Sequence, residues 1–502
     1  MKKFYATLVI LFFIFTSCPV TPDTDNNDAT LLSLSLGTIN VTLGTPDSNF
    51  NSADAAELSI PVNDANNGVT VQIATSSNKA TTAYSIMSPY DSIPIWMNPD
   101  SNVKLRFSKD DIFLIKVTSG NTKEILYYKF IITIIINIDE IAGSPKPQSQ
   151  WGIMLDNFPN NLSNTITGNP KTSRTITWQS SKNTGGVIIG SNLYPSSASF
   201  NNGWYFHRVN ITGLEPGKNY NFIAGSEGAY SPVYGFKTAS DGSSFSILHI
   251  TDTHVSKAAQ PNATTWKRVV EKAVQKCPDA AFIVHTGDIV DDNIEESIPY
   301  YFDFAQTETA SYAFFYSFGN NDQSDWYNQY FYTPQSTFGG ILYSFDYGNA
   351  HFINIDSNRN LTSLQRAWLE NDLMNSSKKW KVVMTHNSDY GRTDNDTALT
   401  KLFDKYNVDL VLAGHNHFYA RSFPIDTAGN EKLNGTVYTI PNTASSKFNP
   451  VADQPFLAVD KQPNLPMFSE IIFTETNIYY YAYTVNNNNS YSLYDSYTME
   501  KP

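Results

Sequence analysis

The stretch Phe245-Ser-Ile-Leu-His-Ile-Thr-Asp-Thr-His254 decides the expected fold, because an apolar run ends directly in metal-ligand residue types. The run has the length and composition of a buried strand, and Asp252 and His254 follow it at once. Apolar residues at helical spacing over Thr265–Lys276 predict a helix, and Ala280–His285 predicts a second strand. Strand, helix and strand in this order are typical of an α/β domain with parallel strands.

Four further segments place the same kinds of side chain after short apolar runs. They are G-D-I-V-D at 287–291, G-N-N-D at 319–322, M-T-H at 384–386 and G-H-N-H at 414–417. Loops at the carboxyl ends of parallel strands converge, so side chains far apart in the sequence are expected to meet there. Carboxylate, amide and imidazole groups together suit Zn²⁺, Mn²⁺ or Fe. A pair of such ions activates water and stabilises a phosphoryl group.

Two other segments of this region have clear patterns. A capping box predicts a helix over Thr362–Asn375, with Leu364, Trp368 and Leu373 facing inward. The apolar and aromatic stretch Phe468–Tyr483 is expected to add edge strands to the domain.

The five metal-ligand segments resemble, in this order, the motifs D-x-H, G-D-x-x-D, G-N-H-D/E, H and G-H-x-H of the calcineurin-like metallophosphoesterases. The resemblance covers residues 245–502 and implies a four-layer αββα domain, with two mixed sheets packed face to face between outer helices. It also implies two divalent or trivalent ions (Fe, Zn or Mn) bridged by Asp288, and a bridging hydroxide that attacks phosphorus in line. The implied ligands are Asp252, His254 and His417 for one ion, and Asn320, His386 and His415 for the other.

The residues before this domain are predicted to form two all-β sandwiches. Short alternating runs fill residues 31–140, which loosely resemble the cadherin-like or immunoglobulin-like modules of bacterial surface proteins. Residues 141–240 contain Leu214-x-Pro-Gly-x-x-Tyr220 and are similar to the fibronectin type III-like domain that precedes the catalytic domain in purple acid phosphatases. The catalytic domain is expected to occupy residues 241–502.

One position departs from the metallophosphoesterase pattern. The family has a His that is thought to contact the phosphate or protonate the leaving group, and this chain has Asn321 there. Asparagine donates hydrogen bonds but is not a general acid at neutral pH. The enzyme is therefore expected to prefer good leaving groups, to use another proton donor, or to be slow. Asp322 is expected to hydrogen-bond within its own loop, as the family's acidic residue does.

Two positions depart from the purple acid phosphatases. These enzymes have Tyr at the end of G-D-x-x-Y and Gly in D-x-G, where this chain has Asp291 and His254. A tyrosinate-to-iron colour is therefore not expected. Asp291 is predicted to orient a metal ligand or a nearby cation, and the alternative is a carboxylate that only stabilises a helix N-terminus.

The N-terminus has the pattern of a bacterial lipoprotein signal. Lys2 and Lys3 precede a short apolar run, and Phe15-Thr-Ser-Cys18 resembles a lipobox, with Phe where the family usually has Leu. Residues 1–18 are therefore expected to be a signal peptide with lipid attached to Cys18, followed by a flexible tether over residues 19–30. An ordinary signal peptide or a short anchor is the alternative. The pattern predicts an extracytoplasmic protein anchored to the cell membrane or outer membrane, in the periplasm or on the cell surface.

Composition narrows the function further. The chain has 502 residues and a formal net charge of −13, and no basic block compensates for this charge. Nucleic-acid binding is therefore not expected, beyond a possible nucleotide substrate. If Cys18 carries lipid, no intramolecular disulfide can form, because Cys277 is the only other cysteine. Cys277 is expected to be a buried helix residue.

Outside the motifs, the sequence predicts histidines that pack within strands and loops that select the substrate. Four histidines are expected to be packed and hydrogen-bonded within strands: His207, His249, His285 and His351. Substrate choice is expected to lie in the loops 292–311 and 323–340 and in the insert 418–450. Aromatic residues of the first two loops could stack on a base or sugar, or could simply pack the loops: Tyr300, Tyr301, Trp326 and Tyr327.

Three functions follow from these observations. A metal-dependent phosphomonoesterase is favoured by the fibronectin-like domain. A phosphodiesterase or nucleotide hydrolase on the same metals is the first alternative, and Asn321 makes it more plausible. A surface binding lipoprotein with an inactive hydrolase domain is the second, although every expected ligand position is filled. The sequence leaves the substrate, the metal identities and the oligomeric state open.

Overall fold

The computed structural model describes residues 29–135 and 138–501 with short gaps. The gaps are 37–38, 44, 50–52, 54, 62–68, 89–92, 95, 99–103, 106, 108–109, 259, 292–294, 323–326, 389–396 and 452–453. The expected signal peptide over 1–18 and almost all of the expected tether lie outside the described residues. The chain divides into two compact units, Met1–Asn137 and Ile138–Pro502.

The first unit is a β-sandwich. One sheet has the order β2-β1-β4-β6, from β1 (Leu31–Leu36), β2 (Ile39–Asn40), β4 (Val69–Thr75) and β6 (Lys104–Leu105). The other has the order β3-β8-β7-β5, from β3 (Ala55–Pro61), β5 (Thr81–Met87), β7 (Ile112–Thr118) and β8 (Ile125–Ile135). Leu34, Phe113 and Phe130 belong to one apolar cluster of this unit. Alternation of buried and exposed residues along its strands, as in β1, gives each sheet one buried face.

The second unit begins with another sandwich, after the short helix α2 (Ile138–Ile141). Its first sheet has the order β13-β14-β10-β9, from β9 (Asn160–Thr165), β10 (Arg174–Ser180), β13 (Ser197–Asn201) and β14 (Trp204–Ile211). The second has the order β12-β11-β15-β16 with β17 also paired to β15, from β11 (Gly186–Ile189), β12 (Asn192–Pro195), β15 (Asn219–Ser226), β16 (Ala229–Tyr230) and β17 (Tyr234–Lys237). Trp178 and Phe222 are fully buried between the two sheets.

A six-stranded sheet opens the α/β part of the chain. Its order is β20-β19-β18-β28-β29-β30, from β18 (Phe245–Ile250), β19 (Ile283–His285), β20 (Phe314–Tyr316), β28 (Met467–Phe473), β29 (Asn477–Val485) and β30 (Tyr491–Glu500). The three strands β18, β19 and β20 are parallel to one another, and β28 joins β18 in the antiparallel direction. The carboxyl ends of the three parallel strands therefore lie side by side.

A seven-stranded sheet completes the α/β part of the chain. Its order is β21-β22-β23-β24-β26-β25-β27, from β21 (Tyr343–Tyr347), β22 (Ala350–Ile355), β23 (Trp380–Thr385), β24 (Leu410–Leu412), β25 (Tyr419–Ser422), β26 (Val437–Pro441) and β27 (Leu457–Lys461). Strands β22, β23, β24 and β26 are parallel in this order. Phe282 and Ile471 from one sheet share an apolar cluster with Phe352 and Val382 from the other, so the two sheets pack face to face.

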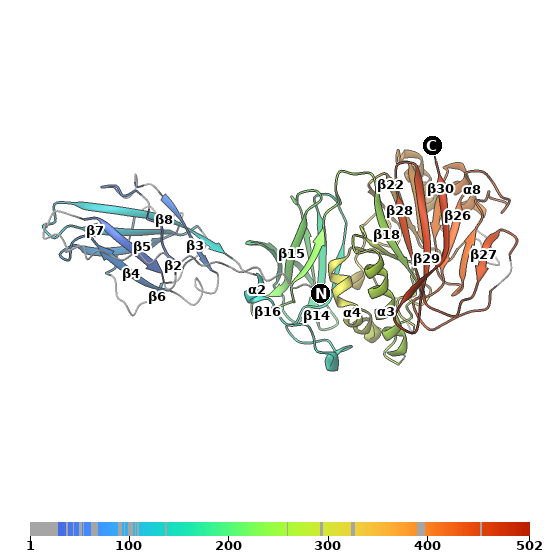
Figure 1. Cartoon of the computed structure of the whole chain (residues 1–502), viewed down its shortest axis with the longest axis horizontal. Helices are drawn as coiled ribbons and strands as arrows, with labels where there is room; N and C mark the ends of the chain where they lie inside the picture. Colours follow the sequence, from blue (N-terminus) through green and yellow to red (C-terminus); the bar gives the residue numbers. More distant parts are fainter. Residues whose placement is uncertain are drawn as a thin grey trace. The chain divides into compact units, whose positions relative to one another are not determined.

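Helices cover the outer faces of both sheets. Helices α3 (Gln260–Lys276) and α4 (Ile298–Phe304) lie against the six-stranded sheet, where Val269 packs in one cluster with Leu248 (Figure 1). Helices α7 (Ser363–Asn375) and α8 (Thr397–Lys405) pack on the seven-stranded sheet through a separate cluster. The expected four-layer αββα architecture after two all-β sandwiches is confirmed.

Two details of the sequence prediction were wrong. The stretch Phe468–Tyr483 does not form edge strands: β28 is an inner strand paired with β18 and β29, and the edge is β30. Leu364 does not face inward, because its side chain is 73% exposed. The capping box itself is present, with Thr362 as N-cap, but Leu369 and Leu373 are the buried positions of α7. The positions of the apolar residues did not identify which face of α7 lies against the sheet.

The second sandwich and the α/β part are joined by a buried ion pair. Lys146 Nζ lies 2.8 Å and 3.0 Å from the two carboxylate oxygens of Asp303 in α4, and it also donates to the carbonyl of Ile153 at 2.9 Å. The Gly152 amide donates to the same carboxylate at 2.7 Å. The side chains of Lys146 and Asp303 are 5% and 3% exposed, so the pair is shielded from solvent and fixes the linker on the helix.

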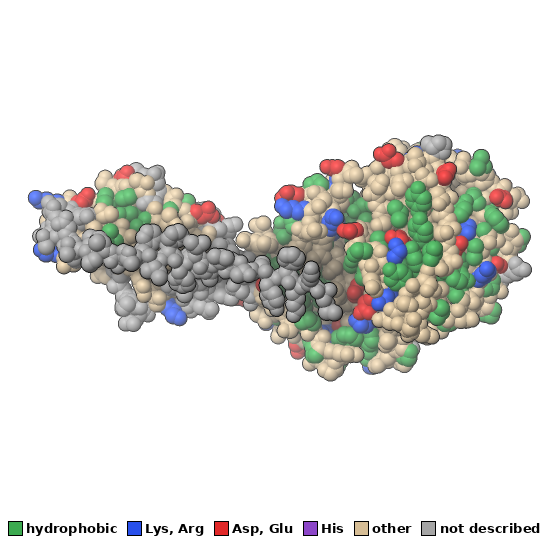
Figure 2. Space-filling model, in the orientation of Figure 1, with side chains coloured by type: hydrophobic (Ala, Val, Ile, Leu, Met, Phe, Trp, Pro, Cys, Tyr) green, Lys and Arg blue, Asp and Glu red, His purple; other side chains and the backbone are tan. Residues whose placement is uncertain are grey.

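The surface of the second unit carries mixed charge. On the face drawn in Figure 2, lysine, arginine, aspartate and glutamate side chains lie singly or in small mixed groups among polar and apolar ones. Within the described residues, none of the helices combines the length and the apolar character that crossing a bilayer requires.

Candidate metal centre

The expected metal ligands all lie at the carboxyl ends of parallel strands. The six-stranded sheet contributes Asp252 and His254 after β18, Asp288 after β19 and Asn320 after β20. The seven-stranded sheet contributes His386 after β23 and His415 and His417 after β24. Because the two sheets pack face to face, the loops from both converge on one place, and the site lies across their junction.

The backbone at these positions is unusual. Five residues have left-handed backbone with positive φ: Asp252 (53°), His254 (44°), Asp288 (53°), His415 (71°) and His417 (53°). Each such non-glycine conformation costs about 1 kcal/mol or more and persists only when its surroundings hold it. The loops therefore curl back sharply after each strand, and this turns the side chains toward one another.

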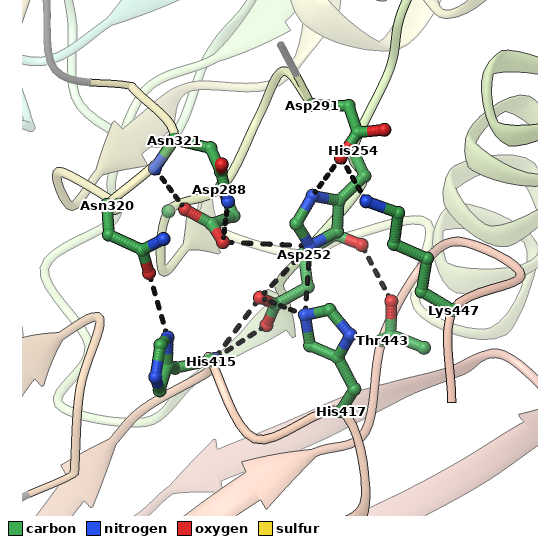
Figure 3. Close-up of polar contacts among 12 residues, drawn as sticks. Asp252, His254, Asp288, Asp291, Asn320, Asn321, His415, His417, Thr443 and Lys447 are labelled. Carbon is green, nitrogen blue, oxygen red and sulfur yellow. Dashed lines mark hydrogen bonds and ion pairs between the residues drawn. The ribbon is translucent and has the colours of Figure 1, made fainter. Parts of the chain in front are cut away.

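One group of ligand atoms is formed by Asp252, His254, Asp288 and His417 (Figure 3). The Nε2 atoms of His254 and His417 are 2.9 Å apart, and His417 Nε2 is 3.1 Å from Asp252 Oδ1. His254 Nε2 is 3.6 Å from Asp288 Oδ2. All four residues are buried, with Asp252 fully so. Two imidazole nitrogens and two carboxylates thus face one small volume.

A second group is formed by Asp288, His386 and His415. His386 Nε2 lies 3.3 Å from Asp288 Oδ1 and 3.1 Å from the amide oxygen of Asn320. The Asn320 oxygen is also 2.8 Å from His415 Nδ1. Asp288 therefore takes part in both groups, with one carboxylate oxygen near each.

Hydrogen bonds around the groups fix the ligand orientation. His386 Nδ1 lies 2.7 Å from the carbonyl of Thr286, which assigns the proton to Nδ1 and leaves Nε2 free to bind an ion. Asp252 accepts from the Thr251 hydroxyl at 2.7 Å and from the His415 amide at 2.9 Å. These contacts place the lone pairs of the ligand atoms toward the centre of the site.

Asn321 and Asp322 hold the loops of the site together. Asn321 donates to Asp288 twice, from its backbone amide at 2.8 Å and from its side-chain amide at 2.7 Å. Asp322 is fully buried and accepts from the Gly319 amide at 3.0 Å and the Ile289 amide at 3.0 Å. Burial, and then the charge of Asp288, raise the pKa of the Asp322 carboxyl. Asp322 thus bonds both within its loop and across to the neighbouring one.

Asp291 lies beside a metal-ligand histidine. Its Oδ1 is 3.2 Å from His254 Nδ1, on the opposite side of the ring from the Nε2 that faces the cluster. The same oxygen forms an ion pair with Lys447 (Figure 3). Contact with His254 Nδ1 holds the pKa of Asp291 down to about 2. In this place the carboxylate contacts a histidine and a lysine.

The electrostatic potential of the site favours cations. Burial alone lowers the pKa of His254, but the nearby carboxylates of Asp252 and Asp291 raise it to about 9. Burial likewise opposes protonation of His386, but the charge of Asp288 raises its pKa to about 9. Buried carboxylates that attract protons so strongly also attract metal ions, which compete for the same imidazole nitrogens.

The residues present fit two metal ions. Carboxylate, amide and imidazole donors match the preferences of Zn²⁺, Mn²⁺ and Fe, and the Asp288 carboxylate is shared between the two groups. The groups open onto a cleft of about 550 Å³. Its lining residues are His254, Asp288, Asn320, Asn321, His415, Asn416, His417, Lys447, Phe448 and Asn449. A small anionic ester could therefore reach the ligand side chains from solvent.

Histidines outside the motifs are packed in the protein. His249 and His285 are fully buried, hydrogen-bonded to Thr286 and Thr253 respectively, and burial lowers both pKa values to about 3. His207 stacks on Trp178 with ring centroids 4.8 Å apart. The fourth, His351 in β22, lies between Asp346 of β21 and Asp372 of α7.

The aromatic side chains expected in substrate loops mostly serve packing. Tyr301 is fully buried in α4 and stacks on Trp266 with ring centroids 4.9 Å apart. Tyr327 is also buried, in the short helix α6 (Tyr327–Tyr330). For these two residues the packing interpretation holds, because the segments fold as helices against the sheet. Trp326 lies outside the described residues.

Lys447 was not identified from the sequence. It lies within the insert 418–450, where no motif sets it apart from other lysines. Its role depends on the path of the chain after β26, which returns to the metal loops. Thr443 shows the same return, because its hydroxyl donates to the Asp252 carbonyl at 2.7 Å (Figure 3). Local sequence carries no signal for such a tertiary contact.

Comparison with known proteins identifies the two folded parts of the second unit. Residues 245–419 match the family model for calcineurin-like phosphoesterases, and residues 159–238 match that for the N-terminal domain of purple acid phosphatases. The chain is 27% identical over 258 residues to acid phosphatase type 7 of Mus musculus, covering 44% of this chain and 58% of the relative. It is 26% identical over 296 residues to purple acid phosphatase 23 of Arabidopsis thaliana, covering 48% and 63%.

Solved structures agree on the fold. Purple acid phosphatase PPD1 from yellow lupin seeds superposes with a TM-score of 0.57 at 16% identity, covering 86% of this chain and 92% of that one. PhoD gives a TM-score of 0.51 at 12% identity, covering 71% and 92%. The chain therefore carries a calcineurin-like phosphoesterase domain preceded by a purple acid phosphatase N-terminal domain. The family model that matches residues 245–419 is one of phosphoesterases, and the chain spans 58% of the length of the mouse relative.

Proposed function

We propose that this protein is a dinuclear metal-dependent phosphomonoesterase, held outside the cytoplasm by lipid on Cys18. The observation that carries the proposal is the convergence of six carboxylate and imidazole side chains from two sheets into two groups that share Asp288, with Asn320 against the second group. A structural cluster would need neither a shared carboxylate nor an opening to solvent, and this one has both.

In the proposed enzyme, Asp252, His254 and His417 would hold one ion, Asn320, His386 and His415 would hold the other, and Asp288 would be shared between them. Two ions held by these residues would supply an activated water for attack on phosphorus and would balance the charge on the phosphoryl oxygens. The chain itself supplies rigidity: Asn321 holds Asp288 by two hydrogen bonds, and Asp322 ties the loops after β19 and β20 together.

Departure of the leaving group is the weak step of this enzyme. Asn321 stands where the related enzymes have a histidine, and its side-chain amide is already bonded to Asp288 at 2.7 Å. An amide does not release a proton at neutral pH. Esters of acidic alcohols or phenols, which leave without protonation, should therefore be the best substrates.

A phosphodiesterase or nucleotide hydrolase on the same ions is the second candidate. Asn321 favours it, since a neutral side chain at this place does not require a second negative charge on the phosphate. A binding protein with an inactive hydrolase domain is the third. It is disfavoured because all seven ligand positions are filled and gathered together.

The first test is hydrolysis of an aryl phosphate monoester and of the matching diester by protein lacking residues 1–18, with added Mn²⁺ or Zn²⁺. Asp288→Asn should lose activity on both, while Asp279→Asn, which changes an aspartate whose side chain is 82% exposed, should retain it. Faster turnover of the monoester supports the proposal, and faster turnover of the diester selects the alternative. No turnover with two ions bound would leave the binding protein.

Colour and anchoring are separate expectations. Iron-loaded protein should lack a tyrosinate absorption band in the visible, because Asp291 replaces the family tyrosine. Wild-type protein should fractionate with membranes and incorporate labelled fatty acid, and Cys18→Ser should abolish both. A soluble wild-type protein without label would refute the lipid anchor.

A further inference from the structure

The segment Thr443–Asn449, which follows β26, is tied at both ends to the metal loops. At one end the Thr443 hydroxyl donates to the carbonyl of Asp252 at 2.7 Å. At the other end the backbone amide of Asn449 donates to the carbonyl of His417 at 3.1 Å, and its side-chain amide donates to the carbonyl of Asn416 at 3.1 Å. The residues between these anchors are therefore held in place over the site rather than free to move away.

Lys447 lies between the two anchors and faces the first group of ligands. Its ammonium forms an ion pair with Asp291, a residue 156 positions earlier in the chain, and Asp291 lies 3.2 Å from His254 Nδ1 (Figure 3). Among the described residues that line the cleft, Lys447 is the only lysine or arginine. The three side chains form a continuous line from the segment to the metal ligand.

The two groups of ligands are oriented by different means. In the second group, His386 Nδ1 is held by a backbone carbonyl, that of Thr286, which no side-chain change removes. In the first group, His254 Nδ1 faces a side-chain carboxylate whose own position depends on Lys447. A change at Lys447 should therefore reach one group and leave the other untouched.

We propose that Lys447 is a positioning residue for the ion held by Asp252, His254 and His417. By fixing Asp291, it holds the His254 ring with Nε2 toward the ion, and it keeps the Asp291 carboxylate on the Nδ1 side. Partners of this kind typically change metal affinity by about 10–100-fold when they are removed. The inference rests on the metal centre of the proposed function but not on the substrate.

The test is a metal titration of the protein that lacks residues 1–18. After removal of metal with a chelator, Zn²⁺ binding to wild-type protein and to Lys447→Met is followed by calorimetry and by metal analysis at fixed free Zn²⁺. Wild type should bind two ions. Lys447→Met should lose about 10–100-fold in affinity for one ion only, and Lys447→Arg should restore it by keeping the charge.

Two further variants sharpen the result. Asp291→Asn should produce the same loss, and combining it with Lys447→Met should add little, because both act on His254 through one path. Lys432→Met is the matched control: Lys432 pairs with Asp404 at side-chain exposures of 42% and 30%, against 42% and 26% for Lys447 and Asp291. This control should bind both ions as wild type does.

Several outcomes would overturn the inference. Unchanged affinity for both ions in Lys447→Met would do so, and so would equal weakening of both. A raised KM for the ester with normal metal binding would instead make Lys447 a substrate-binding residue. If Lys447→Met fails to fold, the other two variants test the inference: Asp291→Asn should weaken the binding of one ion, and Lys447→Arg should not. Wild-type protein that binds two ions but hydrolyses no ester would refute the proposed function and leave this test intact.

Discussion

Replacing Gly319 by alanine should damage the metal centre through a steric clash. A Cβ atom at this position would lie 2.0 Å from the backbone nitrogen of Asp288 and 2.4 Å from its Oδ1. Non-bonded heavy atoms ordinarily stay about 3.5 Å apart. The loops after β19 and β20 would therefore have to separate by about 1.5 Å at the carboxylate shared by the two groups of ligands.

A shift of this size is large for a catalytic group. Misplacement by about 1 Å is expected to cost about 100-fold in rate, or about 2.7 kcal/mol. Gly319→Ala should therefore lose about 100-fold or more in kcat/KM on an aryl phosphate, and it should bind fewer than two Zn²⁺ per chain. The measurements are steady-state kinetics and metal analysis on the same preparation.

Gly242→Ala is the control for the glycine change itself. A Cβ there meets its nearest neighbour, Ser240 Oγ, at 3.6 Å, which is an ordinary contact. This variant should match wild type in rate and in metal content. Gly319→Ala with two bound ions and an unchanged rate would refute the argument, because it would show that the loops can separate without moving Asp288.

Three other changes have predictable effects. Lys146→Met leaves the buried Asp303 carboxyl without its partner and should lower the free energy of unfolding by about 3–5 kcal/mol in urea titrations; Lys171→Met, in an exposed pair, should cost less than about 1 kcal/mol. His351 is held at a pKa of about 9 by Asp346 and Asp372 against the opposing effect of burial, above an unfolded value of about 6.5. Its stabilisation, at most about 3 kcal/mol, is thus full below pH ~6.5 and disappears as the pH rises through 9, so the difference between wild type and His351→Gln should shrink over that range; a constant difference would contradict this. Asn321→His should raise kcat/KM for alkyl phosphates more than for aryl phosphates, and equal gains would show that protonation of the leaving group is not limiting.

Much of the metal centre could be predicted from the sequence because its signals are local. Each ligand comes within a few residues of an apolar strand, and parallel strands bring such positions together without further information. The same reasoning located Asp291 near a ligand, since it follows Asp288 in the same loop. Left-handed backbone at five of the ligands was not predictable, because no residue there is a glycine.

Features that depend on tertiary neighbours were missed. Nothing in Phe468–Tyr483 tells an inner strand from an edge strand, because both are apolar and the difference lies in whether β30 adds beyond β29. The sequence left two roles open for Tyr301, and only the helix α4, which buries it, decides for packing. Lys447 acts through a segment whose anchors, Thr443 and Asn449, are common polar residues.

Asp291, which differs from the purple acid phosphatases, and Asn321, which differs from the metallophosphoesterase motif, would act on opposite halves of the proposed reaction. In the proposed enzyme, Asp291 with Lys447 would support a ligand of one ion and so strengthen the part of the site that activates water. Asn321 leaves the shared carboxylate well held but removes a proton donor from the part that faces the leaving group. Such a site would favour the attack of water on phosphorus, and it would depend on the substrate to supply a leaving group that departs without a proton. Its rate should therefore follow the acidity of the leaving group, and this dependence would separate a specialised enzyme from a decayed one, whose attack would be slow on every ester.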